Sequence, residues 1–349
     1  MNEAIAVTPL PDLRAKLAFL SKPETYGDKS PPLECLETHM SWLFLVGQKV
    51  FKLKKPVCTS FLDFTTLKAR EFSCREEVRL NARLAPGVYL GLLALKWHNG
   101  DFHLVPEDQL PAPGVTVDWL VLMRRLPQQR MLHHLMSSRS IDATDMDALV
   151  AVLGKFYRTA PIAHLSENDY LARFQCEHAR NREVLLRPEF RLQNSALAVK
   201  RLGEALALCS DLLRGRVMSH HVVYGHGDLR PDHVCLLQPP VVIDCREFNA
   251  LLQQVDPLDE IACLGLECEM AGTPWIGPHL ATGIANALDD HPSMALIHFY
   301  TAHRALLRAR LAMAHLLDPQ ARSPAKWPPL AESYLARSLV ATEALTSSL

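Results

Sequence analysis

The segment YGHGDLRPDHVCLLQPPVVIDCREFN, residues 224–249, constrains this chain more than any other part of its sequence. Asp228 comes before a proline-containing loop and a short apolar strand, and a second apolar strand, which follows a Pro-Pro pair, ends in Asp244. A hairpin of this kind carries one carboxylate before its first strand and another at the end of its second, so the two acids can converge on one edge. Paired carboxylates are suited to holding a metal–phosphate and to receiving a hydroxyl proton.

The residues before this segment predict a small antiparallel sheet with one helix packed against it. Asn99–Gly100 is the strongest hairpin signal, because both residues tolerate a positive φ. The expected elements, in order, are a short helix and a loop within 1–32, two strands within 41–57 joined at Gly47–Gln48 and ended by Pro56, a helix from Thr65 or Thr66 to about Ala85, strands on both sides of Asn99–Gly100, and a strand over 115–123.

From about residue 128 onward, apolar residues recur at helical spacing. Strand-like pieces in this part are confined to the neighbourhoods of Val234–Leu237 and Val241–Ile243. After Asp256 the pattern is helical again, and the last expected helix ends at residue 317.

Two packed lobes are expected, because 349 residues are too many for one ordinary core. The change from strands to helices predicts an α+β, bilobal fold with a hinge near 124–128. The expected parts are an N-terminal extension (1–33), a small antiparallel β N-lobe with one helix (34–127), and a larger, mostly α-helical C-lobe (128–349).

Composition excludes several classes of protein. The 37 Lys and Arg residues stand against 38 Asp and Glu residues, which gives no support for a nucleic-acid-binding surface. No run of about eighteen apolar residues is present, and the first residues lack the apolar stretch of a secretory signal. The nine cysteines are scattered without a CxxC pair, so we expect reduced thiols and no zinc site. These features predict a cytoplasmic protein without a membrane span, and they leave the oligomeric state open.

The phrase HGDLRPDHV followed by VVIDCREFN resembles the aminoglycoside phosphotransferase, choline kinase and fructosamine kinase group. Together with ETHMSWLFLVGQKVFKLKKPV and FLDFTTLKAREFSCREEVRLNARLAPGVYLG, it looks most like a bacterial subfamily of aminoglycoside-phosphotransferase-like proteins, over roughly residues 34–315. The resemblance implies a protein-kinase-like fold, ATP and Mg²⁺ as cofactors, and a hydroxyl of a small molecule as the phosphoryl acceptor. The N-lobe would bind the nucleotide, and the C-lobe would hold the catalytic and substrate-binding residues.

Two acids match the family's catalytic motif. By this resemblance Asp228 would orient the acceptor hydroxyl and take its proton, and Asp244 would bridge magnesium to the β- and γ-phosphates. His233 stands where the family usually has the Asn that serves as a second metal ligand, and magnesium prefers oxygen to imidazole. His233 is therefore either a ligand of magnesium or another divalent ion, or a side chain that never touches metal.

The family also has a strand lysine that contacts the α- and β-phosphates and pairs with a glutamate of the helix. Lys52 matches this lysine, and Lys54 is its rival, because it lies two residues on and on the same face of the strand. Glu77 matches the helix glutamate, with the neighbouring Glu76 as the alternative.

The family's phosphate-covering turn and hinge fall on two other segments. Thr38, His39 and Ser41 occupy the turn, which is not glycine-rich, so hydroxyls and backbone N–H groups would cradle the phosphates there. Met123 and Arg124 begin the hinge and would offer backbone groups to adenine.

Four further polar residues are expected to be structural. We expect His226 to brace the loop through a hydrogen bond with the backbone, and Asp259 resembles the buried acid that braces the family's catalytic loop. Glu267 and Glu269 are expected on a solvated helix face rather than against a cationic substrate.

The favoured function is transfer of the γ-phosphoryl group from ATP to a hydroxyl of a small molecule, without nucleic-acid or membrane partners. A nucleotide-binding scaffold that no longer transfers phosphate is the alternative, and His233 is the feature that favours it. Transfer of a nucleotidyl group is a third possibility. A P-loop kinase is excluded because no GxxxxGK[ST] motif occurs. The motifs do not identify the substrate.

Overall fold

The computed structural model describes residues 10–27, 31–59, 62–247, 250–318 and 323–348. The chain forms two compact units, one comprising Met1–Met131 with Val241–Ala250 and the other comprising Leu132–Pro240 with Leu251–Leu349. The segment that carries Asp244 therefore clusters with the first unit, although it falls within the residues expected for the C-lobe.

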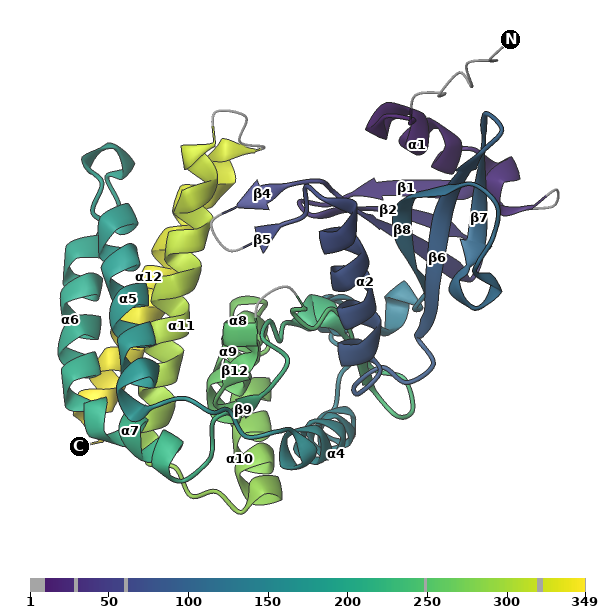
Figure 1. Cartoon of the computed structure of the whole chain (residues 1–349). Helices are drawn as coiled ribbons and strands as arrows, with labels where there is room; N and C mark the ends of the chain where they lie inside the picture. Colours follow the sequence, from purple (N-terminus) through teal and green to yellow (C-terminus); the bar gives the residue numbers. More distant parts are fainter. Residues whose placement is uncertain (1–9, 28–30, 60–61, 248–249, 319–322, 349) are drawn as a thin grey trace, which may run out of the picture. The chain divides into compact units, whose positions relative to one another are not determined.

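An antiparallel six-stranded sheet, in the order β1–β2–β3–β8–β6–β7, forms most of the first unit (Figure 1). Both expected hairpins are confirmed. Gly47 adopts a φ of 55° between β2 and β3, and Asn99 and Gly100 adopt φ of 51° and 89° between β6 and β7. The strands are β1 (Leu33–Glu37), β2 (Ser41–Val46), β3 (Lys49–Lys54), β6 (Tyr89–His98), β7 (Asp101–Pro106) and β8 (Val115–Arg124).

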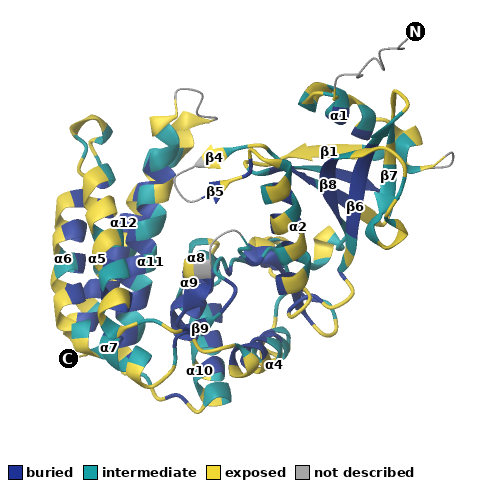
Figure 2. Cartoon of the chain, viewed as in Figure 1, coloured by how far each residue is buried: buried dark blue, intermediate teal, exposed yellow. Residues whose placement is uncertain are grey.

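Buried apolar residues form a core on each face of this sheet, and Figure 2 shows its strands β6 and β8 largely in the dark blue of buried residues. On one face, Leu20 of helix α1 (Leu13–Leu20) packs into a core with side chains such as Phe44 and Leu95. On the other face, Cys74 of helix α2 (Leu67–Asn81) packs with residues that include Trp119. The sheet is thereby fixed between two helices, and the face toward α2 carries the candidate site.

The helix expected between Thr65 or Thr66 and Ala85 is present but shorter. The Thr66 side chain caps its start and accepts a hydrogen bond from the Ala69 N–H at 3.1 Å. The helix ends at Asn81, whose carbonyl accepts from the N–H groups of Leu84 and Ala85 in a turn. Leu84 is buried and continues the apolar pattern, which is why the spacing extends the expected helix beyond its real end.

Three strands of the first unit were not predicted. In β1 only the first residue is partly buried, so its sequence shows no alternation of apolar and polar residues. The paired strands β4 (Cys58–Thr59) and β5 (Leu62–Asp63) have two residues each, which is too short to give a periodic signal in the sequence.

Helices dominate the second unit, as predicted. The two expected short strands are β10 (Val234–Cys235) and, in the first unit, β11 (Val241–Val242), and β9 (Val223–Tyr224) pairs with β12 (Gln254–Val255). The helices are α3 (Leu132–Ser137), α4 (Ala143–Thr159), α5 (Glu167–Leu185), α6 (Ser195–Leu208), α7 (Ser210–Met218), α8 (Ala250–Gln253), α9 (Pro257–Met270), α10 (Ile276–Leu288), α11 (Met294–Ala314) and α12 (Trp327–Thr346). Short 3-10 helices in the first unit are η1 (Pro23–Tyr26), η2 (Glu107–Gln109) and η3 (Gln128–Arg130), and those in the second unit are η4 (Pro188–Phe190), η5 (Pro231–His233), η6 (His315–Leu317) and η7 (Pro324–Lys326).

The prediction that the last helix ends at residue 317 is wrong, because α12 follows and packs along α11 and α6 (Figure 1). Its buried residues recur at intervals of three and four, from Ala331 through Leu335 and Ser338 to Leu345. Many of them are small, so the apolar stripe is weak in the sequence. Among all helices of the described residues, none has the length and apolar character needed to cross a bilayer.

Candidate functional site

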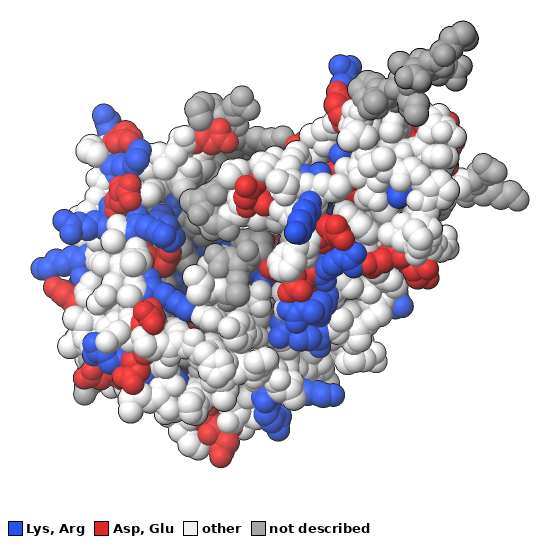
Figure 3. Space-filling view, in the orientation of Figure 1, with Lys and Arg blue, Asp and Glu red and all other residues white. Residues whose placement is uncertain are grey.

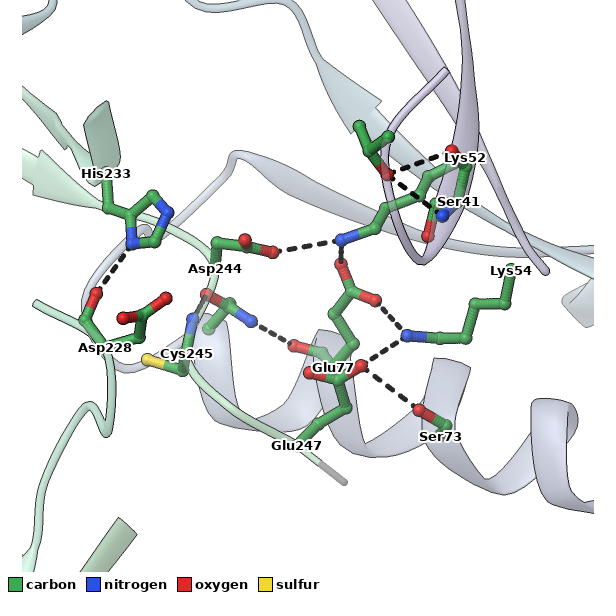
Figure 4. Close-up of polar contacts among 12 residues, drawn as sticks. Ser41, Lys52, Lys54, Ser73, Glu77, Asp228, His233, Asp244, Cys245 and Glu247 are labelled. Carbon is green, nitrogen blue, oxygen red and sulfur yellow. Dashed lines mark hydrogen bonds and ion pairs between the residues drawn. The ribbon is translucent and has the colours of Figure 1, made fainter. Parts of the chain in front are cut away.

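The face of the sheet toward α2 carries a set of connected ion pairs (Figure 4). The Lys52 ammonium lies 2.7 Å from Oε1 of Glu77 and 3.0 Å from Oδ1 of Asp244. Glu77 is fully buried, whereas the Asp244 side chain is 46% exposed. The structure therefore brings together the lysine, the helix glutamate and the metal-binding acid implied by the family resemblance.

Mutual electrostatics keep this set charged. Burial alone would lower the pKa of the Lys52 ammonium, but the carboxylates of Asp244 and Glu77 outweigh burial and raise it well above its ordinary value. Burial alone would raise the pKa of Glu77, but the two strand lysines lower it. Lys52 and Glu77 are thus a cation and an anion at neutral pH.

Lys54 takes part in the same set and does not replace Lys52. Its ammonium lies 2.6 Å from Oε2 of Glu77 and 2.5 Å from Oε1 of Glu247, and Glu247 also accepts from the Ser73 hydroxyl at 3.1 Å. Each lysine therefore occupies one oxygen of Glu77. Sequence reasoning missed Glu247, since nothing near it in the sequence indicates a partner 193 positions away.

Glu76, the alternative partner, lies on the outer side of α2 and pairs with Arg79 at 2.6 Å. On the face shown in Figure 3, Lys and Arg side chains are likewise interspersed with Asp and Glu side chains. Glu77 is the glutamate of this helix that reaches the lysines.

Asp244 has a backbone conformation that few residues adopt. Its φ of 64° lies in the left-handed region, which Asp tolerates better than most side chains. Two hydrogen bonds hold this turn, because the Asp244 N–H donates to the Tyr89 hydroxyl at 3.2 Å and the Cys245 N–H donates to Oδ1 of Asn81 at 2.9 Å. Strain that neighbouring contacts hold in place is frequent at functional sites.

The expected phosphate-covering residues form the turn between β1 and β2. Thr38 and His39 are exposed and Ser41 is buried. The Thr38 hydroxyl donates to the Ser41 carbonyl at 2.9 Å and accepts from the Ser41 N–H at 3.0 Å. The Thr38 hydroxyl therefore closes this turn.

The expected hinge residues lie at the end of β8. Met123 pairs with Val50 of β3, and Arg124 pairs with Lys49. The Arg124 N–H donates to the Val88 carbonyl at 2.8 Å, so this N–H is already used within the first unit.

In the second unit, Asp228 lies in a loop held mainly by Glu260. The Glu260 carboxylate accepts from the backbone N–H groups of His226, at 3.0 Å, and Gly227, and from the Tyr157 hydroxyl at 2.9 Å. Burial raises the pKa of Glu260, and these donated hydrogen bonds oppose that rise. Glu260 is therefore a buried acid that fixes the two residues before Asp228.

The bracing role expected of Asp259 is therefore filled by its neighbour. Asp259 instead binds Arg304 of α11 through two hydrogen bonds of 2.7 and 2.6 Å. Consecutive residues of a helix point in directions about 100° apart, so only one of them can face the loop. The sequence could not distinguish them, because both are acids at the start of α9.

His226 has the expected role, since its Nδ1 accepts from the Asp228 N–H at 3.2 Å. His233 also braces this loop. Its Nδ1 lies 2.7 Å from the Asp228 carbonyl, which can only accept (Figure 4). Its Nε2 lies 3.0 Å from a guanidinium nitrogen of Arg230, which can only donate. Both ring nitrogens of a neutral imidazole are thereby used, and binding a metal would require the Arg230 contact to break.

The solvated helix face expected for Glu267 and Glu269 is wrong for Glu267, whose side chain is 15% exposed, whereas the Glu269 side chain is 32% exposed. Glu267 accepts from Arg308 at 2.8 Å and from the Tyr334 hydroxyl at 2.8 Å, and Glu269 accepts from Arg337 at 2.7 Å. These acids are paired with arginines of α11 and α12 that are remote in sequence.

A magnesium site would have to rest on few protein ligands. Across the ranges that the structure describes, no group of three or more His, Cys, Asp or Glu side chains could hold a metal. Magnesium commonly binds one or two carboxylates together with substrate phosphates and water. The half-exposed carboxylate of Asp244 suits that kind of site.

Comparison with known proteins gives distant matches. A scan against models of protein families finds none that fits. Uncharacterized proteins of Mycobacterium tuberculosis and Mycobacterium bovis are 30% identical to this chain over 290 residues, which cover 80% of this chain and 55% of each relative. The chain thus spans about half the length of the curated relatives that it matches.

Solved structures match over nearly the whole chain. A choline/ethanolamine kinase family protein from Mesorhizobium loti is 14% identical, covers 95% of this chain and 94% of its own, and has a TM-score of 0.55. A thermostable mutant of an aminoglycoside phosphotransferase is 13% identical, covers 93% of this chain and 99% of its own, and has a TM-score of 0.54. The chain therefore has the α+β, bilobal protein-kinase-like fold of the choline and ethanolamine kinases and the aminoglycoside phosphotransferases.

Proposed function

We propose that this chain is a cytoplasmic phosphotransferase that moves the γ-phosphoryl group of ATP, with magnesium, to a hydroxyl of a small molecule. The observation that carries the proposal is the part-buried Lys52–Glu77 ion pair, whose ammonium is in direct contact with Asp244. An ammonium held beside a half-exposed carboxylate matches the two charges of a magnesium–phosphate group, since phosphate needs a cation and magnesium needs oxygen ligands.

In this proposal Lys52 leaves Asp244 when nucleotide binds and contacts the α- and β-phosphates. The half-exposed Asp244 carboxylate would then be available to hold magnesium. A bound magnesium ion would supply positive charge to the phosphate oxygens, and Asp244 would fix where that charge lies.

Asp228 acts on the acceptor. Its carboxylate orients the hydroxyl and takes its proton while the new oxygen–phosphorus bond forms and the bond between the β-phosphate oxygen and the γ-phosphorus breaks, which releases ADP. The contacts of Glu260, His226 and His233 with the loop support this assignment, because a positioned base contributes only when its geometry is fixed.

The test is magnesium-dependent ATP hydrolysis, measured with and without a screen of hydroxyl-bearing metabolites. Asp228→Asn is expected to lower the rate by about 100-fold or more, the effect of removing a general base. Asp232→Asn is the matched control, since that carboxylate lies four residues further on and is 61% exposed. Equal rates for wild type and Asp228→Asn would overturn the assignment.

A nucleotide-binding scaffold without transfer is the second candidate. The observation that favours it is His233, which stands at the position of the family's second metal ligand and whose ring nitrogens contact Asp228 and Arg230. Magnesium-dependent ADP binding together with no ATP turnover under any acceptor would select the scaffold over the enzyme.

A further inference from the structure

We infer that Lys54, Glu247 and Ser73 form a positioning site that fastens the segment carrying Asp244 to helix α2 and keeps Glu77 neutralised when Lys52 turns to phosphate. This inference rests on the proposed function. None of the three side chains would touch nucleotide or metal, so they are positioning residues.

The geometry separates Lys54 from the nucleotide-contacting lysine. The Lys54 side chain is 2% exposed, and its ammonium lies between the carboxylates of Glu77 and Glu247, at 2.6 and 2.5 Å. Lys52 instead reaches Asp244, whose carboxylate is half exposed. Of the two lysines, Lys52 is the one with an exposed partner, the Asp244 carboxylate, which solvent or a phosphate group can replace.

Glu77 links the two halves of this set. One of its oxygens accepts from Lys52 and the other from Lys54, while the whole side chain is buried (Figure 4). A buried carboxylate that loses its only cation is strongly destabilised. Since Lys54 stays in place, Glu77 remains paired when a phosphate attracts Lys52, and the helix need not move.

Glu247 gives the Asp244 segment a third anchor. Asp244 and Cys245 are held through their backbone N–H groups, and Glu247 adds contacts with Lys54 and Ser73 through its side chain. A left-handed residue reverts to an ordinary conformation when its surroundings stop enforcing it. Releasing Glu247 would therefore loosen the carboxylate that is proposed to hold magnesium.

The experiment measures ADP affinity with and without Mg²⁺ by calorimetry, for wild type and for Glu247→Ala. In wild type Mg²⁺ is expected to tighten ADP binding. In Glu247→Ala this magnesium-dependent gain is expected to fall about tenfold, within the range found when residues that orient metal ligands are removed, while ADP binding without metal stays unchanged. Glu247→Gln should recover part of the gain, because its amide oxygen can still accept from Lys54.

Glu71→Gln is the control, because Glu71 is an acid of helix α2 that is 34% exposed and pairs with Arg75 rather than with the site. Should Glu247→Ala fail to fold, Ser73→Ala removes one of the contacts of Glu247 and is expected to lower the gain about threefold, at the low end for a single hydrogen bond, because the Lys54 contact of Glu247 remains.

The outcomes distinguish a failure of the positioning role from a failure of the proposed function. Wild type without a magnesium-dependent gain would overturn the proposed function and with it the inference. A wild-type gain that survives intact in both Glu247→Ala and Ser73→Ala would overturn the inference alone. A change in stability without a change in the gain would assign the three residues to folding only, which also refutes the positioning role.

Discussion

Replacing Arg216 with methionine is expected to destabilise the second unit more than any surface change can. The Arg216 guanidinium lies buried between two buried carboxylates, 2.5 Å from Asp256 and 2.6 Å from Asp290. Asp256 also caps α9 by accepting from the Leu258 N–H at 2.9 Å. Arg216 thus supports the helix whose first turn braces the loop of Asp228.

The magnitude follows from what the change leaves behind. Methionine fills a similar volume but leaves two buried carboxylates without their shared cation. Breaking a buried ion pair by removing one partner costs about 3–5 kcal/mol, so we expect the free energy of unfolding to fall by that amount at pH 7. The Tyr300 hydroxyl, 2.8 Å from Asp256, remains to satisfy part of one carboxylate.

The loss should depend on pH with a definite sign. Burial alone would raise the pKa of Asp290, but the hydrogen bonds and charge of Arg216 lower it. A carboxyl group with a lowered pKa stabilises the folded state above its unfolded pKa, near 3.8, and loses that contribution as pH falls through the folded value. Without Arg216, burial is the largest remaining influence and acts to raise the pKa of Asp290, against the weaker opposing effect of His221, so protonation of Asp290 is expected to stabilise the folded variant as pH falls. The difference in free energy of unfolding between wild type and Arg216→Met should therefore become smaller from pH 7 toward pH 4.

Urea unfolding followed by circular dichroism at pH 7, 5 and 4 measures this gap. Arg214→Met is the matched control on the same helix, because Arg214 pairs with Asp211, whose side chain is 94% exposed, and exposed pairs contribute about 0–1 kcal/mol. A gap below about 1 kcal/mol at pH 7, or one that widens on acidification, would refute the reasoning.

Three further outcomes are expected. Lys52→Met should lower kcat/KM for ATP about 10- to 150-fold, the equivalent of about 1.5–3 kcal/mol for a hydrogen bond to a charged group. It should lower the free energy of unfolding in urea much less than Lys54→Met does. A larger loss of stability in Lys52→Met than in Lys54→Met would contradict this prediction. Gly225→Ala should lower ATP hydrolysis at least about tenfold, because a Cβ would lie 2.6 Å from Oε2 of Glu260; an unchanged rate would mean that the loop is not held there. Polycationic aminoglycosides should give no product about 80 Da heavier by mass spectrometry, because the α9 carboxylates of Asp259, Glu267 and Glu269 are already paired with arginines. Phosphorylation of any aminoglycoside tested would contradict this prediction.

Local chemistry made much of the first unit predictable. The turn residues at Gly47 and Asn99–Gly100 specify hairpins through their tolerance of positive φ, and Thr66 specifies a helix start through its side-chain oxygen. The family resemblance added the partnership of Lys52 with Glu77, which the structure contains.

Long-range pairing was beyond reach of the sequence. The fold places Lys54 against Glu247 and a backbone loop against Glu260. No local sequence pattern predicts these contacts, because the partners are remote in the sequence. The choice between Asp259 and Glu260 depends on the rotation of α9 about its axis. His233 could be recognised as a departure from the family, but its contacts with Asp228 and Arg230 follow only from the loop's geometry.

The most direct measurement is a crystal structure of the protein with ADP and Mn²⁺, which stands in for magnesium and can be located by its anomalous scattering. The metal is expected at about 2.1 Å from a carboxylate oxygen of Asp244, with a nucleotide phosphate within hydrogen-bond distance of the Lys52 ammonium and Lys54 still between its two glutamates. Nucleotide and metal bound away from both Lys52 and Asp244 would contradict the account.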